Sequence, residues 1–353
     1  AQLVPLDVAE AGEKETERLL AAIGDSLPHD VRLATGAARD AVRLSRRSHA
    51  GLALPGRALD LVRETAARLR GDGAPKGAVV EGVDLLETYR LRAGLRPELV
   101  HVGRSLVRAD VENHLAQRVV AQPEAVSAAA RLVIGFKTGL VGTEKPIGTF
   151  LFAGPTGVGK THLAQCLAEY LFGSRTKLLR FDMGEYADTD GVHRFVSGHS
   201  QGGEGGLLAQ LRGTPFAVLL LDEVEKAHPR VLGSLLSLLD EGTLTDHRGD
   251  SVSCQNTVII LTTNVGSEIY RRNPIAFAHG GSQGIGGAVR RELERAFSPE
   301  FLNRMTEVLV FRPLDEATLR QVALRELHAV SRLAASQGLS VGIEPAVAPV
   351  VAA

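Results

Sequence analysis

The amino-acid sequence predicts an α/β fold, in which helices cover a parallel β-sheet and further helices form small subdomains at both ends of the chain. Short, continuous apolar runs at 149–153, 216–221 and 257–263 are the first reason. Runs of this length, separated by helical patterns, are typical of strands that are buried on both faces of a parallel sheet. Weaker runs at 177–182 and 307–311 predict two more strands.

Helical periodicity outside these runs is the second reason. Apolar residues recur at near-helical spacing within 33–44, and again within 59–69 after Pro55 and Gly56, which suit a helix start. The Gly/Pro-rich stretch 71–78 is typical of a linker. Further helices are expected at 79–93, 105–135, 284–297 and 315–336, the last of them begun by Asp315.

Length and composition exclude several classes of protein. The 353 residues correspond to about two domains of roughly 150 residues each. Lys and Arg total 40 and Asp and Glu total 41, a net charge of −1, so we expect no nucleic-acid partner. Two cysteines without a Cys-x-x-Cys exclude a disulfide scaffold and indicate a reducing compartment, the cytoplasm. No apolar run reaches the roughly 18 residues of a membrane span, and the charged N-terminal segment is unlike a signal peptide.

A phosphate-binding loop follows the first strong strand. The string GPTGVGKT fits Gly-x-x-x-x-Gly-Lys-Ser/Thr, and it lies between a strand and a helix, which is the context that this motif requires. Its glycines let successive backbone N–H groups point at a phosphate chain. Lys160 can reach the β- and γ-phosphates, and the Thr161 hydroxyl can bind Mg²⁺. The expected nucleotide-binding residues are Gly154, Pro155, Thr156, Gly157, Val158, Gly159, Lys160 and Thr161.

Polar residues at the ends of later elements are the candidates for catalysis. Asp222 and Glu223 end the second strong strand, where Asp222 would hold Mg²⁺ and Glu223 would act as general base, unless both are solvated acids that cap a helix. Asn264 ends the third strand and would hold the attacking water or sense the γ-phosphate, although Asn after a strand is often a turn residue. Arg304 would stabilise transition-state charge at a neighbouring subunit, but from spacing alone a surface salt bridge is favoured.

Five strings together resemble the Clp family of double-ring AAA+ unfoldases, and specifically their second ATPase module. They are GPTGVGKT (154–161), FDMGEY (181–186), LLDEVEKAHP (220–229), TTNVGS (262–267) and PEFLNR (299–304). The resemblance implies a P-loop NTPase core that hydrolyses ATP with Mg²⁺. In it Lys160, Thr161, Asp222, Glu223, Asn264 and Arg304 take the roles just described. It also implies a homo-oligomer, a hexameric ring in which Arg304 acts on the next subunit, and polypeptide substrates.

The same resemblance implies how the chain is divided. VVAQPEAV (119–126) is similar to the segment that closes over adenine, so Val119 and Val120 are expected to contact the base, with Ala121 where Gly is usual. Residues 1–70 look like the small helical lid of a first module, 71–104 a linker, 105–312 the ATPase core, and 313–353 the start of a truncated C-terminal lid. Because no arginine follows Arg332 for the second sensor, and the ATPase core of the first module is missing from the chain, we expect a fragment of a longer protein.

Three segments bear on what such a ring would do. The segment 198–206 lies where the family has a pore loop, but it carries no aromatic residue to grip a threaded chain. The string GTLTDHRGD (242–250) resembles a second pore loop or is a plain hairpin. In NPIAF (273–277), Ile275 and Phe277 fit the tripeptide that docks on a ClpP-like peptidase, while Ala276 departs from it, and ordinary loop anchoring is the alternative. The expected function is an ATP-dependent unfoldase or remodelling chaperone; the alternative is a nucleotide-gated assembly protein that does not thread substrate.

Overall fold

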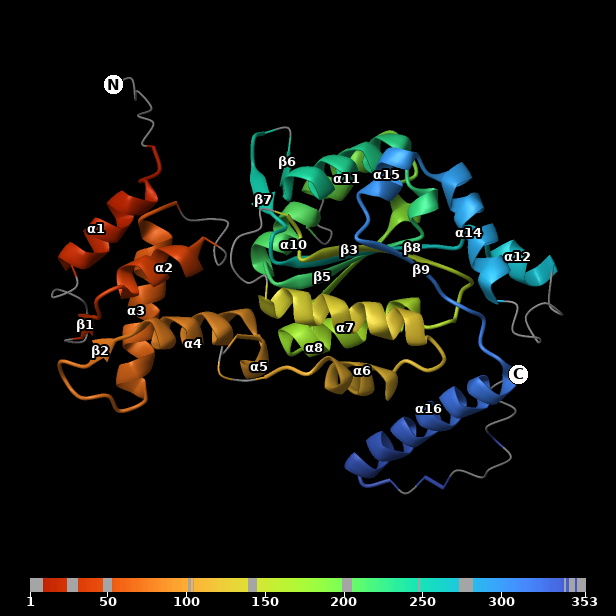
Figure 1. The fold of residues 1–353 in the computed structure, drawn as a ribbon, viewed down its shortest axis with the longest axis horizontal. Coiled ribbons are helices and arrows are strands. Elements are labelled where there is room, and N and C mark those ends of the chain that lie inside the picture. Colours follow the sequence, from red (N-terminus) through yellow and green to blue (C-terminus); the bar gives the residue numbers. More distant parts are fainter. Residues whose placement is uncertain are drawn as a thin grey trace.

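The chain forms a central α/β unit, with a group of helices on its N-terminal side and one long helix on its C-terminal side (Figure 1). The computed structural model describes residues 9–23, 31–46, 53–100, 103, 105–138, 145–198, 205–246, 248–272, 282–339, 341–342 and 347. Within these residues, no helix combines the length and the apolar character that crossing a bilayer requires.

A five-stranded parallel sheet lies at the centre, in the order β4-β5-β8-β3-β9. Its strands are β3 (Gly148–Ala153), β4 (Leu178–Asp182), β5 (Ala217–Asp222), β8 (Thr257–Thr263) and β9 (Glu307–Val310). All five predicted strands are therefore confirmed. Every residue of β3, β5 and β8 is buried, which explains why these strands have continuous apolar sequences and the edge strands do not.

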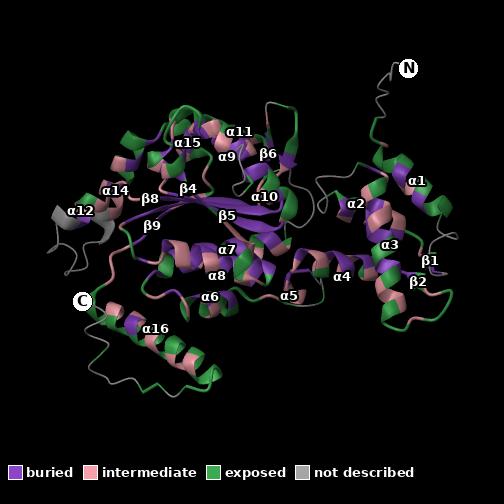
Figure 2. Cartoon of the chain, turned by 180° about the vertical axis from the view of Figure 1, so that it is seen from behind, coloured by how far each residue is buried: buried purple, intermediate pink, exposed green. Residues whose placement is uncertain are grey.

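Helices cover both faces of this sheet (Figures 1 and 2). On one side lie α5 (Pro97–Val100), α6 (Arg108–Ala116), α7 (Pro123–Thr138) and α8 (Lys160–Phe172). On the other lie α9 (Gly191–Ser197), α10 (Leu207–Gly213), α11 (Pro229–Glu241) and α15 (Pro299–Asn303), with α12 (Ser267–Arg272) and α14 (Ser282–Ala296) toward one end. Successive residues of β3 point to opposite faces of the sheet and so belong to two hydrophobic cores. Phe150 and Phe152 belong to the core that contains side chains of α7 and α8, and Leu151 belongs to the core that contains side chains of α11.

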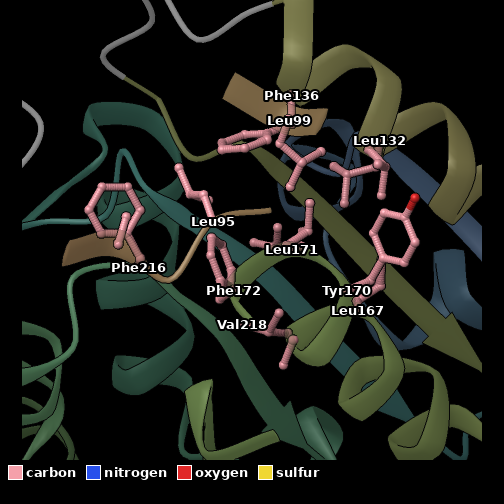
Figure 3. Close-up of a cluster of buried hydrophobic side chains, with 14 of the residues drawn as sticks. Leu95, Leu99, Leu132, Phe136, Leu167, Tyr170, Leu171, Phe172, Phe216 and Val218 are labelled. Atoms are coloured by element: carbon pink, nitrogen blue, oxygen red, sulfur yellow. The ribbon is translucent and has the colours of Figure 1, made fainter. Parts of the chain in front are cut away.

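The packing of α8 fixes the loop that precedes it. Figure 3 shows Leu171 and Phe172 of α8 among side chains from α7 and the sheet. The Phe172 ring lies 6.5 Å from the Phe136 ring and 6.3 Å from the Phe216 ring, centroid to centroid. Burying a large apolar side chain contributes about 1.5–3 kcal/mol. Several such side chains hold α8 against the sheet, so the position of its first turn, where the preceding loop ends, is fixed.

The N-terminal helices form a separate group. They are α1 (Glu13–Ile23), α2 (Ala37–Ser45), α3 (Gly56–Gly71) and α4 (Gly82–Ala93), joined by a parallel pair of two-residue strands, β1 (Arg32–Leu33) and β2 (Val79–Val80). The helices expected at 33–44 and 59–69 are confirmed. The helix expected from residue 79 begins at Gly82, because β2 precedes it. Both α4 and α5 lie within the stretch 71–104 that was assigned to a linker, and α4 packs on α2 and α3.

Two further helical stretches were expected, at 105–135 and at 315–336. The helical stretch 105–135 is two helices, α6 and α7, because the chain turns between them and Ala121 adopts a left-handed conformation with φ 58°. The C-terminal helix α16 (Glu316–Ser336) is confirmed, and Asp315 caps it by accepting a 2.8 Å hydrogen bond from the N–H of Thr318.

Several short elements complete the chain. The strand β6 (Thr243–Thr245), in the predicted second pore loop 242–250, pairs as an antiparallel hairpin with β7 (Ser251–Ser253), which directly follows that segment. Single turns of 3₁₀ helix occur at Arg175–Lys177, Met183–Tyr186 and Val224–Lys226. The last of these follows Asp222 and Glu223 directly, so it belongs to the candidate site.

Candidate nucleotide-binding site

The loop 154–161 runs from the end of β3 into the first turn of α8. Its glycines Gly154, Gly157 and Gly159 have φ angles of 151°, 82° and 102°, in the region that favours glycine. At Gly154 a second constraint applies, because a Cβ atom there would lie 2.6 Å from the carbonyl oxygen of Phe311. The loop leads directly into the N-terminus of α8, and a glycine-rich loop that precedes a helix N-terminus is the arrangement that binds phosphate.

We expect Gly154→Ala to destabilise the fold by about 2–3 kcal/mol, because it adds a steric clash to an unfavourable φ angle. Gly157→Ala is the matched control: it adds the same methyl group to the same loop, but nothing lies within 4 Å of the new atom. This control should cost about 1 kcal/mol. Denaturant unfolding of both variants measures the difference, and equal destabilisation would show that contact with Phe311 does not constrain the loop.

Lys160 is the buried cation of the site. Its Nζ donates hydrogen bonds to the carbonyl oxygen of Gly154, to that of Pro155 at 3.0 Å, and to Oδ1 of Asn264 at 3.0 Å. Burial lowers the pKa of this amine, and the nearby acids Asp222, Glu225 and Glu223 oppose the shift. A phosphate oxygen could replace one of these acceptors without new desolvation of the amine.

Asp222 is held at the carboxyl end of β5 by two hydrogen bonds. Its Oδ1 accepts from the hydroxyl of Thr262 on β8, and its Oδ2 accepts from Nη2 of Arg180 on β4 at 2.5 Å. The side chain of Asp222 is only 13% exposed. Its carboxylate thus already faces a cation.

These residues fit the predicted Mg²⁺. A carboxylate and the hydroxyl of Thr161, in the first turn of α8, are the hard oxygen donors that Mg²⁺ prefers. Among the described residues, no group of three or more His, Cys, Asp or Glu could hold a metal ion. A magnesium ion here would therefore need phosphate and water oxygens as well, which is its usual arrangement beside a nucleotide.

Glu223 has a strained backbone and two side-chain partners. Its φ of 57° is in the left-handed region, which costs a non-glycine residue about 1–2 kcal/mol and is frequent at functional sites. Oε1 accepts a 2.9 Å hydrogen bond from Nδ2 of Asn264, and Oε2 accepts from Nζ of Lys226. Because Asn264 also accepts a hydrogen bond from Lys160, one side-chain amide connects Lys160 to Glu223, the candidate base.

A cavity of about 560 Å³ lies between α6 and α7, and Gln122 of its lining donates a hydrogen bond to the carbonyl oxygen of Val158 in the loop. Its lining is mainly apolar: Glu112, Ala116, Val119, Val120, Ala121, Gln122, Pro123, Val126 and Ser127. Its size and lining suit a purine base. The left-handed φ of Ala121 gives a physical reason why glycine is the easier residue at this turn.

Gln122 is a residue of the site that the sequence did not reveal. Its side-chain amide is buried and donates to the carbonyl oxygens of Val158, at 3.2 Å, and Arg312, at 2.8 Å. Its Oε1 accepts from the N–H of Arg312 at 3.1 Å. It thus ties the turn at Ala121 both to the phosphate loop and to the chain after β9. Thr262 and Arg180 were also missed: Thr262 opens the string TTNVGS (262–267) but received no role, and Arg180 lies in none of the five strings.

Arg304 lies apart from this cluster. It caps the C-terminus of α15, and its Nε forms a 2.6 Å ion pair with Asp240 of α11. The side chain is 38% exposed, so it is accessible at the surface. Within the chain the structure thus shows the salt bridge that spacing alone favoured. The segment 273–277, residues 199–204 of the predicted pore segment and His247 lie outside the described residues.

Comparisons with known proteins agree with this geometry. Residues 145–308 match the family described as AAA domain (Cdc48 subfamily). The chaperone protein ClpB of Rhodopirellula baltica is 41% identical over 242 residues, which cover 67% of this chain and 27% of that protein. ClpC/MecB of Bacillus subtilis, named a negative regulator of genetic competence, is 40% identical over 248 residues, or 67% of this chain and 30% of that protein.

Solved structures extend the likeness to almost the whole chain. The Saccharomyces cerevisiae Hsp104:casein complex in its extended conformation superposes with a TM-score of 0.77 at 30% identity, covering 93% of this chain and 57% of the Hsp104 chain. The chain therefore spans about a third or less of the two curated relatives and little more than half of Hsp104. From its motifs, its sheet and these relatives, the chain belongs to the Clp family of AAA+ proteins.

Proposed function

We propose that the protein hydrolyses ATP and uses the energy to unfold or remodel polypeptides, as a hexameric ring in the cytoplasm. The observation that carries the proposal is the chain of contacts from Lys160 through Asn264 to Glu223, next to the loop 154–161. These contacts support assigning Lys160 as the phosphate-binding cation, Asn264 as a polar relay and Glu223 as the base, because they join the three side chains at the edge of the sheet where ligands bind in open α/β folds.

Hydrolysis proceeds by in-line attack of water on the γ-phosphate, which yields ADP and phosphate. The backbone N–H groups of the loop bind the phosphates, and Lys160 exchanges carbonyl acceptors for phosphate oxygens. Glu223 accepts a proton from the attacking water, and Asn264 keeps its carboxylate oriented. Asp222 and Thr161 would hold Mg²⁺, which would supply positive charge to the phosphate oxygens when bound. The protein forms no covalent intermediate, so its contribution is positioning and charge stabilisation.

Arg304 completes the site of an adjacent copy. Its guanidinium is partly exposed and, among the described residues, pairs with the carboxylate of Asp240, so it can be shared between Asp240 and a neighbouring nucleotide. Val119 and Val120 would contact adenine in the cavity between α6 and α7.

A polypeptide substrate is proposed because the structural relative Hsp104 was solved with casein. Docking on a ClpP-like peptidase through Ile275 and Phe277 is the part of the proposal that rests on the sequence alone. A switch that assembles with ATP but does not thread a chain is the rival function, since the segment 198–206 lacks an aromatic residue.

The test is ATP-dependent unfolding of a tagged, stable fluorescent reporter protein. We expect its fluorescence to fall with ATP and Mg²⁺ and to stay constant with ADP. The reporter is kept without peptidase, so that unfolding is measured and proteolysis is not. Assembly with ATP but no loss of fluorescence would favour the rival function, and the Glu223→Gln variant serves as the control without turnover.

A further inference from the structure

Arg180 is a cation of the site that no motif predicts. It lies on the edge strand β4, which pairs with β5 so that Arg180 is level with Leu220, and Asp182 is level with Asp222. Side chains two residues apart lie on the same face of a sheet, so Arg180 and Asp222 share a face and are diagonal neighbours. The guanidinium spans this diagonal and reaches Oδ2 of Asp222 at 2.5 Å.

The two side chains of this ion pair differ in how far they are buried. The side chain of Arg180 is 57% exposed, whereas that of Asp222 is 13% exposed. Arg180 therefore gives up little hydration to make the contact, but Asp222 would be a nearly buried charge without it. A carboxylate in that position is costly unless a cation or several donors face it.

The contact also uses the oxygen that a metal would need. Thr262 donates its hydroxyl to Oδ1 of Asp222, and Arg180 takes Oδ2. Both oxygens of the carboxylate thus have donors before any metal is present. A divalent cation at Oδ2 would meet a positive guanidinium at the same atom, and like charges at such a distance repel.

We propose that Arg180 is a built-in counter-cation, which neutralises Asp222 while the site is empty and must leave Oδ2 when Mg²⁺ and nucleotide bind. This inference rests on the nucleotide site of the proposed function. It makes Arg180 a positioning residue that sets how much Mg²⁺ the site requires. Without the guanidinium of Arg180, Mg²⁺ would not compete with another cation for Oδ2 of Asp222, and it would meet less electrostatic repulsion at that atom.

The experiment measures how a slowly hydrolysed fluorescent ATP analogue binds across a Mg²⁺ titration that starts in EDTA. In Arg180→Gln we expect half-maximal Mg²⁺-dependent binding at about 3–10-fold lower Mg²⁺ than in the wild type, since each factor of ten corresponds to 1.4 kcal/mol of lost competition. Arg212→Ala is the matched control. It removes another exposed guanidinium, which pairs with Asp250 away from the site, and should leave the Mg²⁺ requirement unchanged.

Thermal unfolding provides a second readout that does not depend on activity. In EDTA without nucleotide, Arg180→Gln should melt a few degrees below the wild type, because Asp222 has lost its cation. With Mg²⁺ and the analogue this gap should close, since the metal takes over the carboxylate. An unchanged or higher Mg²⁺ requirement, or a gap that persists with ligand, would overturn the inference. If the wild type bound no nucleotide at all, the proposed function itself would be refuted.

Discussion

Glu223→Gln is expected to lower ATP turnover by about 10²–10⁴-fold, the contribution of a positioned general base. Nucleotide binding should stay within a few-fold of the wild type, because the amide has the same shape and Lys160 keeps its hydrogen bonds to Gly154, Pro155 and Asn264. Its Oε1 can still accept the hydrogen bond from Asn264. Steady-state phosphate release and equilibrium binding of an ATP analogue measure the two quantities separately.

Two other acids, one near the site and one away from it, serve as controls for this variant. Glu225 is near the site, and its Oε1 accepts a 3.0 Å hydrogen bond from the N–H of Asn264, so Glu225→Gln should cost less turnover than Glu223→Gln. Glu241 is exposed at the end of α11, and Glu241→Gln should have no effect. Turnover of Glu223→Gln within a few-fold of the wild type would exclude this carboxylate as the base. An equal loss in Glu225→Gln would leave the base unassigned.

Arg304→Ala is expected to lower turnover of the assembled ring by about 10³–10⁵-fold, the contribution of an arginine finger to phosphoryl transfer. Nucleotide binding should change little. The loop 154–161 and the cavity that would hold a nucleotide belong to one subunit, whereas the Arg304 of that subunit acts on the nucleotide of the adjacent one. Size measurement in the presence of nucleotide checks that the ring still forms, and phosphate release measures the loss.

Asp240→Ala separates this role from a structural one. It breaks the same ion pair within the chain but leaves the guanidinium in place. An exposed ion pair of this kind contributes about 0–1 kcal/mol to stability, so its loss alone should be tolerated. If Arg304 only holds α15 against α11, the two variants should behave alike. If it acts on a neighbour, Asp240→Ala should keep most of the activity.

Local features of the site could be predicted from the sequence because they are encoded within a few residues. The loop 154–161 has its glycines and lysine at fixed spacing, and the apolar runs at 149–153, 216–221 and 257–263 are too long and too uniform for surface strands. In parallel strands the carboxyl ends meet at one edge. Asp222, Glu223 and Asn264 could therefore be expected near one another and near Lys160, as the structure shows.

Contacts that depend on strand order could not be predicted. Arg180 and Asp222 are 42 residues apart, and they meet only because β4 pairs with β5. Gln122 and Arg312 are 190 residues apart, and nothing in the string around Gln122 indicates that its amide is buried. The turn between α6 and α7 was missed because apolar residues continue through it, with Val119 buried as in a helix.

The strands β1 and β2 were missed for a different reason. Each has only two residues, too few to show an alternating pattern, and they form because Arg32–Leu33 and Val79–Val80 are brought side by side by the helices around them. Arg304 is the opposite case. The resemblance implies a role toward a neighbouring subunit, but within the described residues the structure shows the pair of Arg304 with Asp240, and a role in a ring needs a second copy to be seen.

Mixing two inactive variants tests most directly whether one copy completes the site of the next. Glu223→Gln subunits keep Arg304, and Arg304→Ala subunits keep Glu223, so a mixed ring contains sites with an intact base beside an intact guanidinium. With random assembly we expect about a quarter of the sites to be of this kind, and ATP turnover to return to a corresponding fraction of the wild-type rate. Turnover of the mixture no higher than the sum of the two separate variants, in rings shown to contain both, would contradict the account.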